Sequence, residues 1–386
     1  MSEEKNTLDL GALRKEIDRI DTELVSLFTT RMQVSSKVAA YKRQTGMAVT
    51  DTAREEALLS RVASLSPDEI SHYTKTLYRN IMALSRAYQH QKLGADSKAM
   101  THLTDALRAP RAHFPTAAKV ACQGTAGAYS FLAASKLFKA PDIFPCQSFA
   151  DVFDAVGEGR CDYGVLPVEN STAGSVTEIY DLMAKHRFYI VRAVRLPVTH
   201  CLLAKKGTTL SKVTKILSHR QALSQCDAFL KEHAHISAVS VENTAVAAKR
   251  VAESDEPIAA IASPSCAALY GLDVLSCHVA NTENNCTRFI CIAKEPEYYV
   301  GADKTSIICT LPHRQGSLCE VLTRFDALGA NLTKLESRPI PEKDFEFRFY
   351  FDFHTHNSAA TLPLLLSELS GEHEDFRYLG TYLEVE

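Results

Sequence analysis

The sequence lacks the features of membrane, secreted and nucleic-acid-binding proteins. No apolar run reaches the roughly 18 residues of a membrane span, and the N-terminal segment MSEEKNTLDL is acidic and has no apolar core typical of a signal peptide. The net charge of -3 disfavours a nucleic-acid surface. These absences predict a soluble, cytoplasmic protein without membrane or nucleic-acid partners.

Metal and cofactor motifs are also missing. The eleven cysteines are an odd number without a CxxC pair, which disfavours a disulfide framework and a thiolate zinc site. The H-x-H pairs at His233/His235 and His354/His356 have no neighbouring cysteine or carboxylate pattern. Neither GxGxxG nor GxxxxGK[ST] occurs, which disfavours dinucleotide and phosphate-loop chemistry. We therefore expect no metal and no cofactor.

Glycine and proline are scarce in residues 8–92, which contain two glycines and one proline. Three helices are predicted there, interrupted at Gly46 and at Ser66-Pro67. The first covers about residues 9–44 and is roughly 50 Å long at 1.5 Å per residue. A small domain cannot cover such a helix alone, so we expect it to pack on a second copy in a homodimer.

The apolar stripe of this first helix is interrupted at Arg31. The stripe is spaced by three and four residues, which places its members on one face: Leu10, Leu13, Ile17, Ile20, Leu24, Leu27, Arg31, Val34, Val38 and Tyr41. A buried guanidinium requires either a protein carboxylate or an anionic ligand. Lys42 lies about 20° around the helix from Arg31, whereas Arg14 lies about 100° away.

Other polar residues gather where the second helix begins and along the third. Asp51, Arg54 and Glu55 lie at the start of the second helix, and Ser85 and Gln89 share a face of the third. Taken singly, each has a structural explanation as a cap or a solvated side chain. Together with three cations, and without a paired nucleophile and base, the set suits a small dianion rather than covalent chemistry.

Residues 8–92 resemble the helical chorismate mutase domain, whose pattern is matched at Arg14, Arg31, Lys42, Asp51, Arg54, Glu55, Ser85 and Gln89. The resemblance implies rearrangement of chorismate to prephenate by positioning and electrostatics. It implies that Lys42 and Gln89 stabilise the ether oxygen, and that Arg14 and Arg31 hold the two carboxylates. The remaining residues would make the other polar contacts. Because one arginine of that family crosses from the partner subunit, we expect Arg14 to act across the dimer.

Beyond residue 93 the sequence predicts two further domains with different patterns of helices and strands. Short apolar runs alternate with helical stretches in the middle, which predicts an α/β domain with its ligand site at the strand ends. The tail is predicted to be β-α-β-β-α-β, a ferredoxin-like order, with its last strand at residues 378–385. We divide the chain into a helical domain (1–93), a linker (94–118), the α/β domain (119–294), a second linker (295–303) and the α+β tail (304–386).

Four short motifs of the middle domain resemble those of the prephenate dehydratase family. They are a G-x-x-G-x-[YF]-S loop at 124–130, a P-x-E-N-[ST] loop at 167–171, an S-H-x-Q segment at 218–221 and a T-R-F triplet at 287–289. Any one alone is more readily structural. Together they imply a two-lobed α/β domain like the periplasmic binding proteins, which removes water and carbon dioxide from prephenate to give phenylpyruvate.

By the family's pattern, Thr287 is the favoured proton donor to the departing hydroxyl, and Glu169 is the second choice. Asn170 and Gln225 are expected to assist catalysis. Ser130, Ser171, Ser218 and Arg288 are expected to bind the substrate.

The tail resembles an ACT domain of the phenylalanine-sensing kind. Its effector-binding residues would be Gly316, Ser317 and Leu318 at a helix start and Glu336, Ser337 and Arg338 near the end of a strand. Backbone N–H groups at a helix start can receive an amino-acid carboxylate. A structural subdomain that holds a dimer together is the alternative.

These resemblances predict a bifunctional enzyme of phenylalanine biosynthesis that forms a homodimer or a higher homo-oligomer and is inhibited by phenylalanine. A mutase joined to a prephenate dehydrogenase is a second reading, but it requires a dinucleotide loop that the chain lacks. The alternative from another class is a two-lobed amino-acid sensor or binding protein without dehydratase activity.

Overall fold

The structure is a computed structural model of the 386-residue chain. It describes residues 9–93, 104–282, 284–340, 346–355, 358–372 and 375–386. The chain divides into two compact units, one built from Met1–Arg108 and Ile308–Arg377, the other from Ala109–Ile307 and Tyr378–Glu386. The predicted division at residues 93, 118, 294 and 303 stays a prediction.

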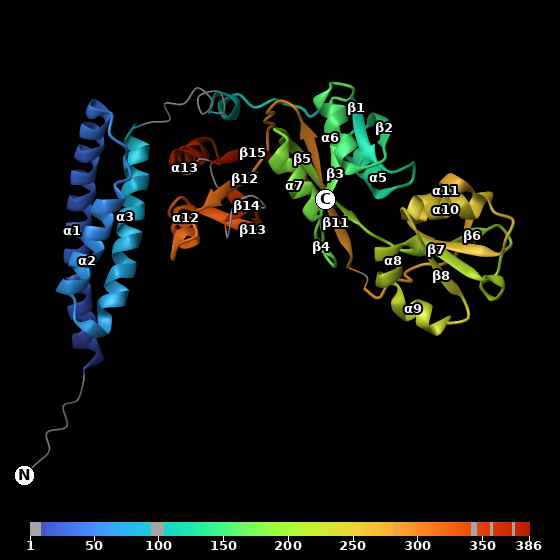
Figure 1. The fold of residues 1–386 in the computed structure, drawn as a ribbon, viewed down its shortest axis with the longest axis horizontal. Coiled ribbons are helices and arrows are strands. Elements are labelled where there is room, and N and C mark those ends of the chain that lie inside the picture. Colours follow the sequence, from blue (N-terminus) through green and yellow to red (C-terminus); the bar gives the residue numbers. More distant parts are fainter. Residues whose placement is uncertain (1–8, 94–103, 283, 341–345, 356–357, 373–374) are drawn as a thin grey trace, which may run out of the picture. The chain divides into compact units, whose positions relative to one another are not determined.

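The N-terminal part consists of three long helices, as predicted: α1 (Leu10–Thr45), α2 (Thr52–Leu65) and α3 (Ser71–Leu93) (Figure 1). α1 ends at Gly46, whose φ of 70° lies in the left-handed region that glycine adopts at little cost. Asp51 caps α2 by accepting a hydrogen bond from Arg54 N at 3.1 Å. A short 3-10 turn, η1 (Asp68–Ile70), follows Pro67, so α3 begins a few residues later than predicted.

α1 and α2 both pack on α3, yet the apolar stripe of α1 stays largely exposed within the single chain. Its exposed fractions range from 41% to 68% at Leu10, Leu13, Ile17, Ile20, Leu24, Leu27, Val34, Val38 and Tyr41. A row of this size is unusual on an isolated soluble domain because exposed apolar surface is costly.

The first lobe of the middle domain is a seven-stranded sheet in the order β16-β5-β11-β3-β1-β2, with β4 beside β3. Its strands are β1 (Ala117–Gln123), β2 (Ala140–Cys146), β3 (Tyr163–Asn170), β4 (Gly174–Ser175), β5 (Tyr189–Pro197), β11 (Cys286–Ala293) and β16 (Glu384–Val385). Three helices pack on it: α5 (Tyr129–Leu137), α6 (Phe149–Gly157) and α7 (Thr177–Lys185).

The second lobe is a five-stranded sheet in the order β10-β6-β9-β7-β8. Its strands are β6 (Cys201–Lys205), β7 (Lys215–His219), β8 (Ser237–Val241), β9 (Ile258–Ala262) and β10 (Leu272–Ser276). Between them lie η2 (Leu210–Lys212), α8 (Arg220–Gln225), α9 (Asp227–Glu232), α10 (Thr244–Glu253) and α11 (Pro264–Tyr270). The chain passes between the lobes twice, once between β5 and β6 and once between β10 and β11, which confirms the predicted two-lobed α/β architecture.

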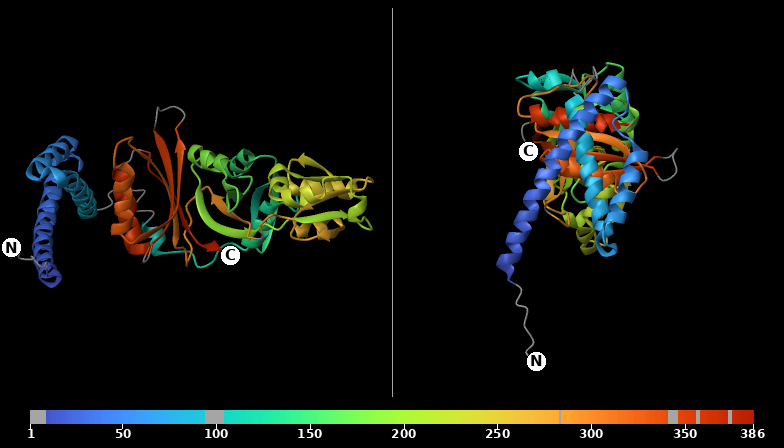
Figure 2. Two further views of the ribbon diagram at one scale, coloured as in Figure 1. Left: turned by 90° about the horizontal axis from the view of Figure 1, so that it is seen from below. Right: turned by 90° about the vertical axis from the view of Figure 1, so that its left-hand side faces the viewer.

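The C-terminal elements follow the predicted β-α-β-β-α-β order: β12 (Lys304–Leu311), α12 (Ser317–Ala327), β13 (Ala330–Pro339), β14 (Phe347–Thr355), α13 (Ser358–Glu372) and β15 (Arg377–Tyr382). The sheet order is β13-β14-β12-β15. α12 contacts β13, α13 contacts β14, and the two helices contact each other (Figure 2). The boundary between the compact units falls within β12 and β15, so both strands continue from one unit into the other.

The prediction of a single last strand at residues 378–385 is wrong. β15 ends at Tyr382, and the chain then forms the separate strand β16 in the sheet of the first lobe. Gly380 permits this change of sheet. Its φ is 140°, and a Cβ at this position would lie 2.1 Å from Ile190 O, so a larger residue could not approach β5 so closely.

The segment predicted as the first linker contains regular structure. Residues 104–108 form a short helix, and β1 begins at Ala117, two residues before the predicted domain start. Residues 94–103 lie outside the described part of the chain. Within the described part, no helix has the length and apolar character required to cross a membrane.

Candidate active sites

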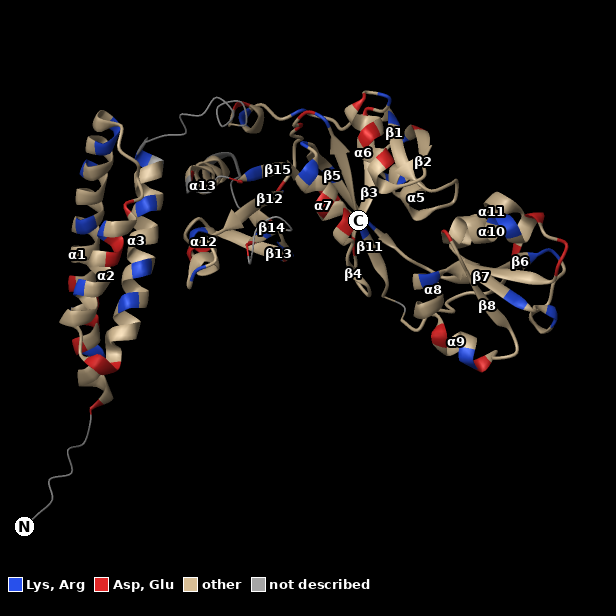
Figure 3. Cartoon of the chain, viewed as in Figure 1, with Lys and Arg blue, Asp and Glu red and all other residues tan. Residues whose placement is uncertain are grey.

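The three helices enclose a pocket of about 420 Å³. Seven of the eight residues predicted for this site line it: Arg31, Lys42, Asp51, Arg54, Glu55, Ser85 and Gln89. Figure 3 shows basic and acidic residues interspersed along these helices. The gathering of cations around the pocket is therefore a local feature rather than part of a basic face.

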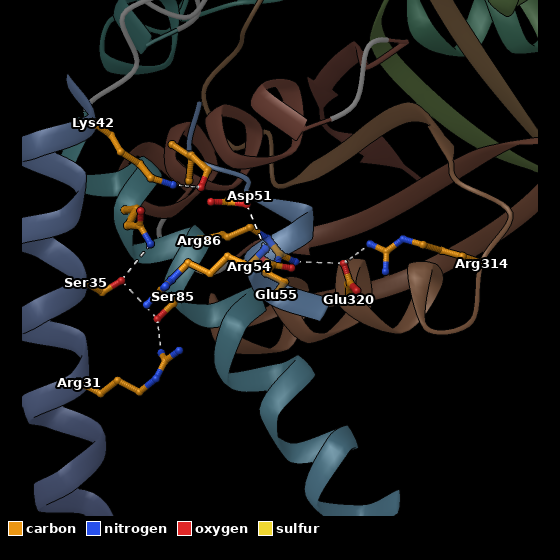
Figure 4. A network of polar contacts seen from close by, with 12 residues as sticks. Arg31, Ser35, Lys42, Asp51, Arg54, Glu55, Ser85, Arg86, Arg314 and Glu320 are labelled. Atoms are coloured by element: carbon orange, nitrogen blue, oxygen red, sulfur yellow. Dashed lines mark hydrogen bonds and ion pairs between the residues drawn. The ribbon is translucent and has the colours of Figure 1, made fainter. Parts of the chain in front are cut away.

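A chain of hydrogen bonds fixes one wall of this pocket (Figure 4). Arg31 Nη1 donates to Ser85 Oγ at 2.6 Å, and Gln89 Nε2 donates to Ser35 Oγ at 3.0 Å. The two serine hydroxyls are 3.3 Å apart, so they join the two halves. Burial lowers the pKa of Arg31, but a guanidinium stays charged at working pH. Neither Arg31 nor Gln89 is therefore a loose surface side chain.

Lys42, on the same helix as Arg31, and the start of α2 also line the pocket. Lys42 Nζ donates to Val49 O at 2.5 Å, which directs the ammonium group toward the segment before α2. The second atom of the Gln89 amide, Oε1, is buried without a hydrogen-bond partner among the described residues. This free end is an acceptor, so it can bind a donor group of a ligand, whereas donation from Gln89 to a ligand requires the amide to turn over and present Nε2.

Arg86 is a residue of this site that the sequence analysis missed. It is 5% exposed and donates from Nη1 to both carboxylate oxygens of Glu55, at 2.5 and 2.7 Å. Its Nη2 lies 3.1 Å from Glu320 on α12, which also pairs with Arg314 at 3.2 Å (Figure 4). Its place in the sequence could have indicated it, because Arg86 follows Ser85 directly and precedes Gln89 by three residues, which puts it close to both on the helix.

Arg14 is the one predicted residue that the structure does not bring to this pocket. It is exposed on α1, and 17 residues separate it from Arg31. At 1.5 Å per residue this spacing is about 25 Å along the helix. A contact with a ligand in the pocket of the same chain is therefore ruled out by distance.

A larger cavity of about 590 Å³ lies between the two lobes of the middle domain. Four of the residues predicted for this domain line it: Ser130, Asn170, Gln225 and Thr287. They come from α5, the end of β3, α8 and the start of β11, so both lobes contribute. This agrees with the expectation that the site lies where strands end.

Thr287 and Asn170 face each other across neighbouring strands of the first lobe. Asn170 Nδ2 donates to Thr287 Oγ1 at 2.9 Å and to Asn285 Oδ1 at 2.7 Å. Asn170 Oδ1 accepts from Ala173 N at 2.9 Å, which fixes the orientation of the amide. Because Thr287 accepts this hydrogen bond through its oxygen, its own hydrogen can be donated toward the cavity.

Gln225 connects the second lobe to the rest of the cavity wall. Its Nε2 donates to Thr172 Oγ1 of the first lobe at 2.7 Å. Its Oε1 accepts from Asn285 Nδ2 at 3.2 Å and lies 2.9 Å from His200 Nε2. His200 and Asn285, each 3% exposed, lie on the two segments that pass between the lobes. The sequence analysis missed both, although Asn285 lies just two residues before Thr287.

Burial lowers the pKa of His200 more than its hydrogen bond to Gln225 raises it, which favours the neutral imidazole. Its Nδ1 is buried and has no hydrogen-bond partner among the described residues. Such a ring donates from Nε2 to Gln225 and keeps an unshared pair on Nδ1.

The other four residues predicted for this domain are absent from the cavity lining: Glu169, Ser171, Ser218 and Arg288. Ser218 is fully buried and donates to Ile261 O at 2.6 Å. Ser171 Oγ accepts from Cys286 N at 2.9 Å and thereby holds the start of β11. Glu169 and Arg288 are paired across β3 and β11, one residue along from Asn170 and Thr287 and hence on the other face.

The charge of this cavity differs from that of the helical pocket. None of the described residues that line it is lysine or arginine. Its acidic residues are Glu178 and Glu242, its histidines are His200 and His219, and Tyr129 also lines it. An anionic ligand would be held there by neutral donors.

The predicted effector residues lie in two places of the C-terminal part. Gly316, with φ of 90°, precedes α12, and Ser317 begins it. Ser317 is buried, and its Oγ has no hydrogen-bond partner among the described residues. Ser317 lines a 290 Å³ pocket, which Leu318 and the β13 residues Glu336, Ser337 and Arg338 do not line.

Comparison with known proteins gives matches in both parts of the chain. The family "Chorismate mutase type II" matches residues 13–90, and the family "Prephenate dehydratase" matches residues 120–297. The bifunctional chorismate mutase/prephenate dehydratase of Escherichia coli strain K12 is 32% identical over 383 residues, which cover 97% of this chain and 96% of that protein. The chain belongs to the bifunctional chorismate mutase/prephenate dehydratase family.

Solved structures resemble the dehydratase part of this family member. A prephenate dehydratase from Arthrobacter aurescens in complex with L-Phe is 30% identical, with a TM-score of 0.63, and the match covers 69% of this chain and 89% of that one. A quorum-quenching acylase, GqqA, is 32% identical, with a TM-score of 0.62, and the match covers 68% and 97%.

The two matched regions contain the two sites. Every residue that lines the helical pocket falls within the chorismate mutase match, and every residue that lines the interlobe cavity falls within the prephenate dehydratase match. Among the described residues, no group of three or more His, Cys, Asp or Glu side chains is arranged to hold a metal ion.

Proposed function

We propose that this chain catalyses two consecutive reactions, the rearrangement of chorismate to prephenate in the helical pocket and the conversion of prephenate to phenylpyruvate in the interlobe cavity. The observation that carries the proposal is the presence, in one member of this family, of two separate pockets that each gather residues predicted for one reaction. The product of the first reaction is the substrate of the second.

The first reaction breaks an ether C–O bond and forms a C–C bond within one molecule, so it needs no proton donor, nucleophile or cofactor. A compact conformer must be held, and negative charge that develops on the ether oxygen must be stabilised. We assign Lys42 to the ether oxygen, together with Gln89 once its amide has turned over to present Nε2, and we assign Arg31 to a carboxylate. Asp51, Arg54, Glu55 and Ser85 would complete the polar wall, with Arg86 fixing Glu55.

The second carboxylate would be held by Arg14 of a partner subunit. Support comes from the exposed apolar stripe of α1 and from the distance of Arg14 from its own pocket. A homodimer that covers this stripe would bring a second α1 against the first. Higher assemblies and a cytoplasmic location stay predictions from the sequence.

Subunit mixing tests the crossing arginine. Arg14→Ala and Arg31→Ala chains should each be inactive as mutases, whereas a refolded equal mixture should recover up to about a quarter of wild-type activity, because half of the dimers then carry one intact site of two. Two Arg31→Ala preparations mixed in the same way are the control. Absence of recovery, in a sample shown by light scattering to be dimeric, would contradict the assignment of Arg14.

In the second reaction the ring carbon loses its carboxylate as carbon dioxide, and the electron pair of that C–C bond enters the ring. The bond from the opposite ring carbon to its hydroxyl oxygen breaks, and one proton converts the hydroxyl into water. We assign this proton to Thr287, whose oxygen accepts from Asn170. Gln225 would hold the lobes in register, and Glu169 stays the second choice of donor.

The lack of lysine and arginine in the cavity lining supports this chemistry. A cation beside the leaving carboxylate would stabilise the substrate more than a transition state in which that charge is disappearing. We assign Ser130 and backbone N–H groups to substrate binding. Ser171, Ser218 and Arg288 would shape the site from outside the cavity.

We assign phenylalanine as the effector, bound at the start of α12 by residues 316–318 together with Glu336, Ser337 and Arg338 of β13, in an ACT domain. The L-Phe complex of the Arthrobacter relative supports the choice of ligand, and the buried hydroxyl of Ser317, which has no partner among the described residues, supports the start of α12 as the site. Equilibrium dialysis of the full chain should show phenylalanine binding that Gly316→Val weakens, because valine strongly disfavours a φ of 90°. Equal binding by the variant would place phenylalanine at another site, and no binding by either chain would favour the structural role of the tail.

One incubation tests the whole proposal. Purified chain supplied with chorismate alone should form prephenate and then phenylpyruvate, without NAD and without metal, and added phenylalanine should slow phenylpyruvate formation. Chorismate left unchanged would contradict the mutase, whereas prephenate that accumulates without further reaction would contradict the dehydratase and favour a sensor.

A further inference from the structure

The end of the chain is part of the sheet that carries Thr287. β16 pairs in parallel with Ala193 and Val194 of β5, and Ala193 N donates to Leu383 O at 3.1 Å. β5 in turn pairs along its length with β11. Figure 1 shows the C-terminus beside these strands, and residues 378–386 belong to the same compact unit as the two lobes.

Glu384, the first residue of β16, contacts three cationic side chains. Its Oε2 lies 2.6 Å from Arg288 Nε and 2.9 Å from Lys304 Nζ, and its Oε1 lies 2.6 Å from Arg195 Nε. The side chains of Glu384, Arg288 and Lys304 are 11%, 7% and 4% exposed. Buried charges of this kind are stable only while their partners remain, because desolvation is expensive.

The electrostatics favour the charged form of Glu384. Burial raises its pKa, but Arg288, Lys304 and Arg195 together lower it by more, so the pKa lies below the ordinary value. Glu384 is therefore an anion that three cations share.

Tyr382 is a second side chain near the C-terminus that contacts Arg288. Arg288 Nη2 donates to Tyr382 Oη at 2.6 Å, and this hydroxyl lies 2.7 Å from Ser306 Oγ. Arg288 thus contacts the tail through two of its nitrogens, Nε and Nη2. The close approach at Gly380 brings this part of the tail against β5.

Arg288 is the direct chain neighbour of Thr287. Successive side chains of a strand point to opposite faces, so Thr287 reaches the cavity while Arg288 reaches the tail. Holding Arg288 by an ion pair with Glu384 and a hydrogen bond to Tyr382 fixes the backbone at the start of β11. The same backbone sets the 2.9 Å hydrogen bond between Asn170 and Thr287.

We propose that Glu384 is a positioning residue of the dehydratase reaction, which acts through Arg288 to hold Thr287 in its productive place. The proposal rests on the proposed function. Glu384 does not line the cavity, so its effect is on the placement of the proton donor and not on substrate contacts.

The test is a double-mutant cycle with Glu384→Gln, Arg288→Gln and the double variant, and with Glu386→Gln as the exposed control. Dehydratase kcat should fall about tenfold in Glu384→Gln while KM for prephenate stays within about twofold. The double variant should be no slower than the slower single variant, because both changes break one connection. Glu384→Asp should recover part of the rate.

Mutase activity and amide hydrogen exchange separate this proposal from its alternatives. Mutase kcat should be unchanged in all variants, which excludes general misfolding. Exchange at residues 286–289 should be faster in Glu384→Gln than in Glu386→Gln, a readout that does not depend on turnover. An unchanged kcat, equal exchange, or additive losses in the double variant would overturn the proposal, whereas a wild-type chain that leaves prephenate unconverted would contradict the proposed function instead.

Discussion

The helical pocket and the interlobe cavity would hold the same molecule, prephenate, yet the charged side chains that line them differ. The pocket is lined by five cationic side chains, Arg31, Lys42, Arg54, Arg61 and Arg86, whereas the described lining of the cavity has none. The first reaction keeps both carboxylates, so cations can hold them throughout. The second expels one carboxylate, so tight binding of that group would oppose the reaction. On the proposed function, each site is matched to the charge that changes in its reaction and not to the charge of the ligand.

The strongest test of the contrast is the removal of the proton donor from the cavity. Thr287→Val keeps the shape but not the hydroxyl, and should lower dehydratase kcat by about 10²- to 10⁴-fold, the range of general acid catalysis. Thr287→Ser should keep most of the activity. Stopped assays of phenylpyruvate from prephenate measure both. Normal turnover in the valine variant would move the role to Glu169 or to water.

The counterpart in the helical pocket is Arg31→Ala. Loss of this partly buried donor should lower mutase kcat/KM by about 10²- to 10³-fold while the dehydratase rate from prephenate stays unchanged. Arg19→Ala is the matched control, because Arg19 lies on the same helix with its side chain 65% exposed. Equal mutase rates in the two variants would show that Arg31 does not bind substrate.

A cation introduced into the cavity should make this site bind prephenate more tightly and turn it over more slowly. Thr177 lines the cavity at the start of α7, and Thr177→Lys should lower KM for prephenate while lowering kcat about tenfold, because the substrate is stabilised more than the transition state. Thr177→Met, of similar length without charge, is the control. A lysine variant with raised kcat would show that the absence of cations has no catalytic purpose.

The smallest expected effect concerns pH. The pKa of His200 is lowered by burial, so the unfolded chain binds a proton there at a higher pH than the folded chain does. This contribution to stability is present above the unfolded pKa and is lost progressively as pH falls below it. His200→Gln should therefore lose less thermal stability than wild type when the pH falls from 7.5 to 5.5, as measured by calorimetry. An equal loss in both proteins would show that another group causes the pH dependence of stability.

Much of the helical site followed from local rules. The apolar periodicity predicted α1 and showed that Arg31 interrupts its apolar stripe. Helical spacing placed Ser85 and Gln89 on one face, because residues four apart share a face. Arg86 was missed because its partner Glu55 lies 31 residues away, on another helix. In the cavity, Asn170 and Thr287 were found by their motifs, whereas His200 and Asn285 carry no motif and matter only through their contacts with Gln225.

The sequence by itself determined the order of helices and strands, the two-lobed alternation and the residue types at both sites, because these depend on neighbours within a few positions. Only the tertiary structure decided which neighbours in the chain face the cavity and which face away. Thr287 and Arg288 are adjacent and polar, and the pleat of one strand sends the first to the cavity and the second to Glu384 at the far end of the chain. No local pattern can predict that pairing, because it depends on a contact across 96 residues and on the one glycine, Gly380, that lets the tail approach β5.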